Sequence, residues 1–243
     1  MLIDPSKSID NSINIDNTVD FYFSIFRKKK LFSLFKGLED DLINQYADLK
    51  KELFNTDFST IQEFVLNIET GIDRESYDIS WSIPKANDLI IDKKMSYTEV
   101  SISHLYSDFS NLEEGKLKHY GHKEVDSFEP IIVSYYLPTR ELIVIDGNHR
   151  VYTAVQRENK KIKAHVLTAY ANSLIMNERS YKLYSFHHNL VNLTQLCCNP
   201  VVWKFASNKS LQWSTYDGTA RFNNVFLKKI LLLIKQPYLP KAK

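Results

Sequence analysis

The chain has 243 residues, of which 44% are hydrophobic and 25% charged, and this balance is typical of a protein with a core and excludes general disorder. Lys and Arg total 31 against 29 for Asp and Glu, so the net charge of +2 does not favour nucleic acid as the main partner, although it is compatible with a local basic patch. Only 6 glycines are present, and no two have the spacing of a dinucleotide or Walker A motif, which excludes glycine-rich phosphate loops.

The cysteines and the apolar runs indicate the cellular setting. Cys197 and Cys198 are adjacent, and such a pair supplies neither a disulfide framework nor a zinc site made of thiols alone. The first five residues lack the positive segment of a secretion signal, and the apolar run 230–234 is too short to span a bilayer. We therefore expect a reducing, cytoplasmic setting with no membrane partner.

Residues 1–94 are predicted to form an N-terminal helical region. Apolar side chains recur every three or four positions through 38–53, which predicts an amphipathic helix. Ser59 and Gln62 have the spacing of a capping box and precede a second apolar stripe, so another helix is predicted to end near Gly71.

Residues 95–170 are predicted to form an α+β domain with a small mixed sheet. Four stretches have the β-branched, alternating or continuous apolar pattern of strands: 97–102, 131–136, 142–145 and 161–167. A short turn joins the second and third stretches as a hairpin, and a tight turn and a helix separate the third from the fourth. Helical spacing then returns, so 171–243 is predicted to be a mostly helical C-terminal region with a last apolar helix face at 226–234.

The turn after the third predicted strand has the composition of an anion site. Its residues are Asp146, Gly147, Asn148, His149 and Arg150. Glycine allows a sharp turn, Asp146 or Asn148 can cap the following helix, and the first N–H groups of that helix carry the positive end of its dipole. The imidazole and the guanidinium add donors, so a phosphate site is predicted. The alternative is a plain turn with His149 and Arg150 in solvent.

The order proline, apolar strand, hairpin, Asp-Gly-x-His-Arg, helix and apolar strand, carried by 129–133, 142–154 and 163–166, resembles the ParB/sulfiredoxin-type nucleotide-binding superfamily, which includes the ParB-like nuclease domain. The resemblance covers 95–170. It implies that 146–150 holds the phosphates of a nucleoside triphosphate or diphosphate, accompanied by Mg²⁺. The superfamily includes sulfiredoxins, partition proteins that bind cytidine triphosphate, free-serine kinases and nuclease-like proteins, so the fold alone selects no activity.

Two branches of the superfamily match the residues poorly. The reactive cysteine of sulfiredoxins would stand where this chain has Asn148, and partition proteins carry a Gly-Glu-Arg-Arg type of motif followed by a helix-turn-helix that is not evident here. The kinase branch needs a carboxylate to accept the proton of the acceptor hydroxyl. Asp108, Glu113 and Glu114 are the candidates in 104–115, and solvated loop acids are the alternative interpretation.

Two pairs of histidines are candidate metal ligands: His119 with His122, and His187 with His188. A metal needs imidazoles that converge on one point with a third ligand, which neither spacing provides, so no metal site is predicted. The sequence as a whole predicts a nucleotide-binding protein, with phosphotransferase or nucleotide-hydrolysing activity and a small hydroxylated acceptor if it is an enzyme. The alternative is a non-catalytic nucleotide-gated or DNA-associated module of a phage or mobile element.

Overall fold

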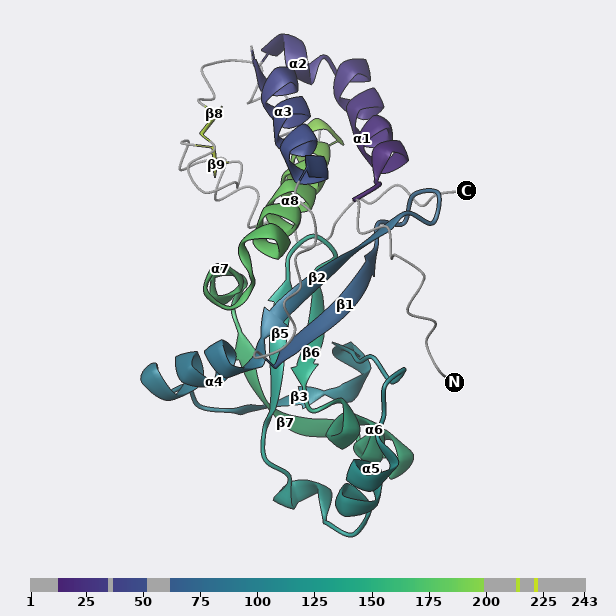
Figure 1. Cartoon of the computed structure of the whole chain (residues 1–243), viewed down its shortest axis with the longest axis vertical. Helices are drawn as coiled ribbons and strands as arrows, with labels where there is room; N and C mark the ends of the chain where they lie inside the picture. Colours follow the sequence, from purple (N-terminus) through teal and green to yellow (C-terminus); the bar gives the residue numbers. More distant parts are fainter. Residues whose placement is uncertain (1–12, 35–36, 52–61, 199–212, 215–220, 223–243) are drawn as a thin grey trace. The chain divides into compact units, whose positions relative to one another are not determined.

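The chain divides into two compact units, and each is assembled from separate stretches of sequence. The computed structural model describes residues 13–34, 37–51, 62–198, 213–214 and 221–222 (Figure 1). Unit 1 comprises Met1–Thr56, Asn67–Tyr77 and Lys182–Lys243, and unit 2 comprises Asp57–Leu66 and Asp78–Tyr181. Strands β1 (Glu63–Glu69) and β2 (Ser76–Ser82) and helix α8 (Glu178–Cys198) each contribute residues to both units.

Unit 2 contains a mixed sheet with the strand order β3-β7-β5-β6-β4. Its strands are β3 (Thr98–Ser101), β4 (Leu105–Tyr106), β5 (Ile131–Tyr136), β6 (Glu141–Asp146) and β7 (Lys161–Leu167). β5 pairs antiparallel with β6 and parallel with β7, while β3 is antiparallel to β7 and β4 is parallel to β6. The predicted strands, the hairpin and the α+β class are confirmed, whereas the two-residue β4 is too short to leave a pattern in the sequence.

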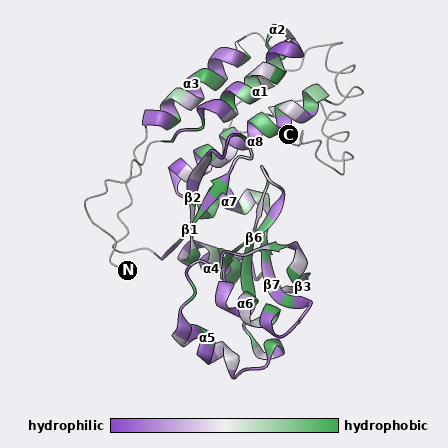
Figure 2. Ribbon diagram, turned by 90° about the vertical axis from the view of Figure 1, so that its right-hand side faces the viewer, coloured by the Kyte–Doolittle hydropathy of each residue, from purple (hydrophilic) through white to green (hydrophobic). Residues whose placement is uncertain are grey.

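One face of this sheet is covered by α5 (Glu114–Gly121) and α6 (Asn148–Gln156), which pack against each other. The core between them and the sheet includes Val100, Phe128, Ile131, Val133, Val144, Val151, Ala154, Ile162 and Ala164. Apolar residues are dense along β6 in Figure 2, whereas hydrophilic and apolar residues alternate along β7. The short 3₁₀ helices of this unit are η1 (Ile102–His104), η2 (Val125–Ser127) and η3 (Ala169–Ala171). The core therefore fixes α6 on the sheet and places its first turn at the end of β6.

The opposite face of β5 is held by one buried amide, that of Asn172 in α7 (Asn172–Ile175). Its Oδ1 accepts hydrogen bonds from Trp81 Nε1 at 2.9 Å and from Ser134 Oγ at 2.6 Å, and its Nδ2 donates to the carbonyl of Tyr135 at 3.0 Å. Because every one of these polar groups is paired, the amide can be buried at little cost. Helix α4 (Ile83–Asp92) follows Trp81 and begins with a side-chain cap from Ser82.

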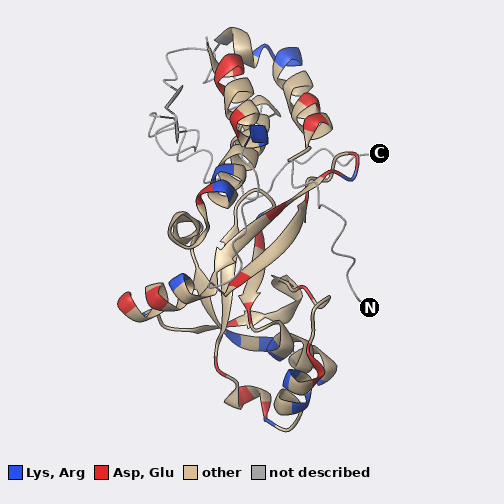
Figure 3. Ribbon diagram, in the orientation of Figure 1, with Lys and Arg blue, Asp and Glu red and all other residues tan. Residues whose placement is uncertain are grey.

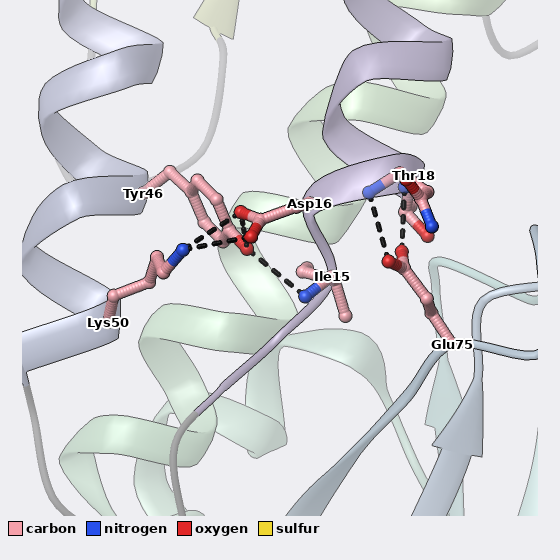
Figure 4. A network of polar contacts seen from close by, with 7 residues as sticks. Ile15, Asp16, Thr18, Tyr46, Lys50 and Glu75 are labelled. Carbon is pink, nitrogen blue, oxygen red and sulfur yellow. Dashed lines mark hydrogen bonds and ion pairs between the residues drawn. The ribbon is translucent and has the colours of Figure 1, made fainter.

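Unit 1 contains α1 (Asp16–Lys28), α2 (Leu31–Leu34) and α3 (Leu38–Lys51), and α3 confirms the amphipathic helix predicted over 38–53. Polar contacts hold the start of α1 (Figure 4). The Tyr46 hydroxyl accepts from the Ile15 N–H at 3.1 Å and donates to Asp16 at 2.8 Å, and Lys50 Nζ lies 2.9 Å from the same carboxylate oxygen. These bonds join the first turn of α1 to the last turns of α3.

The first N–H groups of α1 are satisfied from a distant part of the chain. The carboxylate of Glu75 accepts hydrogen bonds from the backbone N–H groups of Asn17 and Thr18 at 2.9 and 2.7 Å (Figure 4). A carboxylate at this end of a helix is also favoured by the helix dipole. A residue nearly sixty positions away thus serves as the cap that the local sequence lacks.

The predicted helix ending near Gly71 is wrong, because its residues form β1, which pairs with β2. Within β1 the buried residues Leu66 and Ile68 alternate with exposed neighbours, which is the two-residue period of a strand. Pairing with β2, a strand that local spacing does not reveal, overrides the weaker helical pattern. The residues 1–94 are therefore not wholly helical, and Ser59 of the proposed capping box lies outside the described residues.

Some predictions concern segments that the structure describes only in part. The last apolar helix face, at 226–234, lies outside the described residues. Within the ranges that are described, none of the helices combines the length and apolar character that crossing a bilayer requires.

The ion pair between Asp16 and Lys50 predicts a pH dependence of stability. The hydrogen bond from Lys50, and next that from Tyr46, lower the pKa of Asp16 below its ordinary value of 3.8. A carboxylate with a lowered folded-state pKa contributes stability above the unfolded-state pKa and loses it as the pH falls through the folded-state pKa. Asp16→Asn should therefore cost up to about 1 kcal/mol at pH 7, the range for an exposed pair, and the cost should shrink below pH ~4.

Urea unfolding of the parent and of Asp16→Asn at pH 7 and pH 3 measures this difference. Asp20→Asn is the matched control, because Asp20 is exposed on the same helix. An equal loss of stability at both pH values would show that the Asp16 charge does not carry the effect.

Candidate functional site

The turn between β6 and α6 requires glycine for two reasons. Gly147 has a φ of +106°, which side-chain-bearing residues adopt only with strain. A Cβ at this position would also lie 2.5 Å from Cγ2 of Ile131 and 3.0 Å from Nε of Arg150. The first hydrogen bond of α6 runs from the Val151 N–H to the carbonyl of Gly147 at 3.0 Å. The turn is therefore pressed against β5 and against its own arginine.

Arg150 points into the protein. It is only 6% exposed, its Nη2 forms an ion pair of 2.6 Å with Asp146, and its Nη1 donates to the carbonyls of Glu129 and Pro130 at 2.9 and 3.0 Å. The interpretation that placed this side chain in solvent is wrong, because the partly buried carboxylate and the two carbonyls replace its hydration. Arg150 fastens the turn to the segment that precedes β5, while its positive charge remains at the start of α6.

No described side chain caps α6. The prediction that Asp146 or Asn148 would do so is wrong: Gly147 occupies the N-cap position, and the Asp146 carboxylate is engaged by Arg150. Asn148 directs its Nδ2 toward the carbonyl of Val144 at 3.5 Å, and its buried Oδ1 has no partner among the described residues. The start of α6 therefore leaves the first-turn N–H groups uncapped and adds an unpaired amide oxygen beside them.

His149 joins this turn to the loop before α5. Its Nε2 accepts a hydrogen bond of 2.8 Å from the backbone N–H of Glu113. Burial, followed by the nearby positive charge of Lys116, lowers the pKa of His149 below its usual 6.5. Because a backbone N–H can only donate, the imidazole is neutral and carries its proton on Nδ1. His149 is thus half-buried and engaged, not simply in solvent as the plain-turn interpretation assumed.

The three candidate acids differ in where they lie. Glu113 is the N-cap residue of α5 and forms an ion pair of 2.6 Å with Lys116, whose hydrogen bond lowers the pKa of the Glu113 carboxyl. Asp108 accepts a hydrogen bond from the Ser110 N–H at 2.9 Å, and Glu114 pairs with the exposed Lys118 at 2.8 Å. Figure 3 shows acidic residues where α5 begins and basic residues along the helix. Among the three, Glu113 is the acid that the described contacts bring to the turn.

Three residues outside the predicted set complete the site. Phe109 makes an edge contact with Tyr152 of α6, with ring centroids 5.4 Å apart, so the loop touches α6 at a second point. Arg157 donates to the carbonyl of Gly121 at 2.6 Å and holds the end of α5. Nothing in the local pattern singles these residues out, because each contact joins positions more than thirty residues apart.

The histidine pairs lie outside any cluster of potential metal ligands in the described part of the chain. Among the described residues no group of three His, Cys, Asp or Glu side chains could hold a metal ion. His187 is buried in unit 1, where its Nδ1 lies 2.6 Å from the hydroxyl of Tyr77, and burial lowers its pKa to about 4. Its role is therefore that of a paired core residue.

Comparison with known proteins gives no match. No family model matches the chain, and neither a curated protein nor a solved structure matches it.

The crowding around Gly147 predicts a large loss of stability on adding one methyl group. Gly147→Ala should destabilise the protein by about 2 to 4 kcal/mol, because the Cβ would require both a left-handed alanine and a shift of Ile131. Gly115→Ala is the control, since that glycine lies in α5 with open space around its Cβ position and alanine is the better helix former. Similar urea midpoints for the two variants would show that the turn is not tightly constrained.

Proposed function

We propose that unit 2 is a nucleotide-binding domain of the ParB/sulfiredoxin type and that the start of α6 binds the phosphates of a nucleoside triphosphate or diphosphate. The observation that carries this proposal is the first turn of α6, which follows the glycine turn and is capped by no side chain among the described residues. Helix α4 has a side-chain cap and α1 receives the carboxylate of Glu75, whereas α5 and α7, like α6, have no side-chain cap at the N-cap residue. An anion would accept hydrogen bonds from the first N–H groups of α6, as the carboxylate of Glu75 does for α1.

The charges around the turn support an anionic ligand over a neutral one. The first turn of α6 carries the positive end of the helix dipole, and the guanidinium of Arg150 lies beside it in an ion pair with Asp146. Lys116 stands close enough to His149 to influence its titration. Since Arg150 is buried, its contribution to a phosphate would come mainly from its charge, while backbone N–H groups would supply the hydrogen bonds.

The residues present do not make a metal site of their own. No cluster of three metal-ligating side chains occurs in the described part of the chain. A Mg²⁺ ion that accompanied the nucleotide would therefore have to be held mainly by phosphate oxygens and water, and its contribution would be to offset phosphate charge. The free thiols of Cys197 and Cys198 suit the reducing, cytoplasmic setting that we propose for this site.

Glu113 is the residue on which an enzymatic activity would depend. The hydrogen bond from Lys116 lowers the pKa of this carboxyl, which keeps it ionised and makes it a weaker base than an unpaired glutamate. In the enzyme it would take the proton from the hydroxyl of a small acceptor beside the terminal phosphate. We propose phosphoryl transfer to such an acceptor, or to water, as the reaction. The alternative is a nucleotide-gated or DNA-associated module without turnover, for which the same phosphate site would suffice.

Nucleotide binding is tested by direct titration of ATP, ADP, CTP and GTP with and without Mg²⁺. A nucleotide at a hundred times its dissociation constant should stabilise the protein by roughly 2.7 kcal/mol. Lys116→Gln should weaken binding about threefold to tenfold by removing a positive charge beside the turn. Lys118→Gln, on the same helix and paired with Glu114, is the control and should bind like the parent. Absence of binding by every nucleotide would remove the proposal.

Turnover separates the enzyme from the passive module. If the protein is an enzyme, Glu113→Gln should keep nucleotide affinity within a few-fold while lowering turnover by about 10²- to 10⁴-fold, because a base acts on the proton and hardly on the bound ground state. Glu114→Gln and Asp108→Asn serve as comparisons, and a loss confined to one of them would move the role to that residue. A parent without turnover on any nucleotide or hydroxylated acceptor would favour the binding module.

A further inference from the structure

The hydrogen bond between Glu113 and His149 depends on the protonation state of one nitrogen. The Glu113 N–H donates to Nε2 across 2.8 Å. When the imidazole is protonated, Nε2 carries a hydrogen of its own and can no longer accept. The bond therefore exists only with the neutral ring, and gain of a single proton from solvent removes it.

This bond closes a segment of chain onto α6. The segment 107–113 leaves the end of β4, touches α6 through Phe109 and Tyr152, and ends at the start of α5 with the bond to His149. The Glu113 side chain does not cap its own helix. Without the imidazole as acceptor, the aromatic pair still links this segment to α6.

We propose that His149 is a proton-operated latch: its neutral imidazole fastens the segment 107–113 to α6, and an anion at the start of α6 releases the segment by recruiting Nε2 as a hydrogen-bond donor. A phosphate and the Glu113 N–H require opposite states of this nitrogen, so they exclude each other. The latch itself stands on the contacts of the ligand-free protein, whereas the release by an anion rests on the proposed function.

The surroundings of the ring set the direction of the switch. The charged groups that face His149 are Lys116 and Glu113 from the α5 side and Asp146 and Arg150 from the turn. Burial and Lys116 outweigh the two carboxylates, so the pKa lies below 6.5 and the latch is closed at neutral pH. A phosphate would reverse this balance, because its negative charge stabilises the protonated ring.

The amide resonance of Glu113 reports the latch in the full-length protein. We expect its ¹H shift to move upfield between pH 8 and pH 5 with the same midpoint as the His149 ring, below 6.5. His149→Gln places an amide oxygen close to the position of Nε2 and does not titrate, so its Glu113 resonance should stay constant over this range. His104→Gln, which replaces an exposed histidine of η1, should behave like the parent.

The pH series tests, without any ligand, whether the Glu113 N–H is released when His149 is protonated. A Glu113 resonance that does not follow His149 in the parent, or that titrates unchanged in His149→Gln, overturns it. Retained dispersion of the remaining amide resonances shows that each variant is folded.

Addition of inorganic phosphate at pH 7.5 tests the release. We expect a saturable upfield shift of the Glu113 amide in the parent and a smaller one in His149→Gln. Binding of phosphate to the amides of 148–150 with no movement of Glu113 overturns the coupling. Absence of phosphate binding at those amides counts against both the coupling and the proposed phosphate site, while the pH series still judges the latch independently.

Discussion

The burial of the Arg150 guanidinium determines the arrangement of the site. A buried guanidinium is costly unless its donors are paired, and removal of one partner of such a pair typically costs about 3 to 5 kcal/mol. Asp146 and the carbonyls of Glu129 and Pro130 supply that pairing. These partners lie at the end of β6 and just before β5, so the arginine joins the open ends of two neighbouring strands. The close approach that results leaves no room for a side chain at Gly147.

The same ion pair explains why α6 begins without a cap. An aspartate next to the N-cap position would ordinarily accept from the first N–H groups of the helix. Here Arg150 holds the Asp146 carboxylate, and the Nδ2 of Asn148 is directed back to the carbonyl of Val144. Stabilising the turn therefore removes both local caps and leaves a positive helix end. In unit 1 the equivalent requirement of α1 is met by Glu75, which shows that this fold does satisfy helix ends where a carboxylate can reach them.

The spacing of apolar residues and the turn residues predicted those elements of the fold that are set by neighbouring residues in the chain. The hairpin 131–146, the glycine turn and the following helix all appear where the alternation of apolar residues and the turn residues indicated. The helix predicted to end near Gly71 failed because β1 is stabilised by β2, and the partner of a strand cannot be read from the spacing within it. The inward direction of Arg150 was missed for a similar reason, since two of its acceptors are backbone carbonyls about twenty residues earlier.

The candidate acids also could not be told apart from the sequence, because the contacts that distinguish them join distant parts of the chain. The resemblance to the kinase branch gave Asp108, Glu113 and Glu114 equal standing, because all three are acids of the stretch 104–115. The fold separates them by where the backbone of the loop meets α6: the N–H of Glu113 bonds His149, whereas the Glu114 side chain pairs along α5 with Lys118. The imidazole thus holds the backbone of Glu113, the residue for which we propose a role as base, and it does so only while the ring is neutral. If the proposed phosphate site exists, an anion that favours the protonated His149 would release the Glu113 N–H as it binds, so phosphate binding and the placement of Glu113 would be one linked equilibrium.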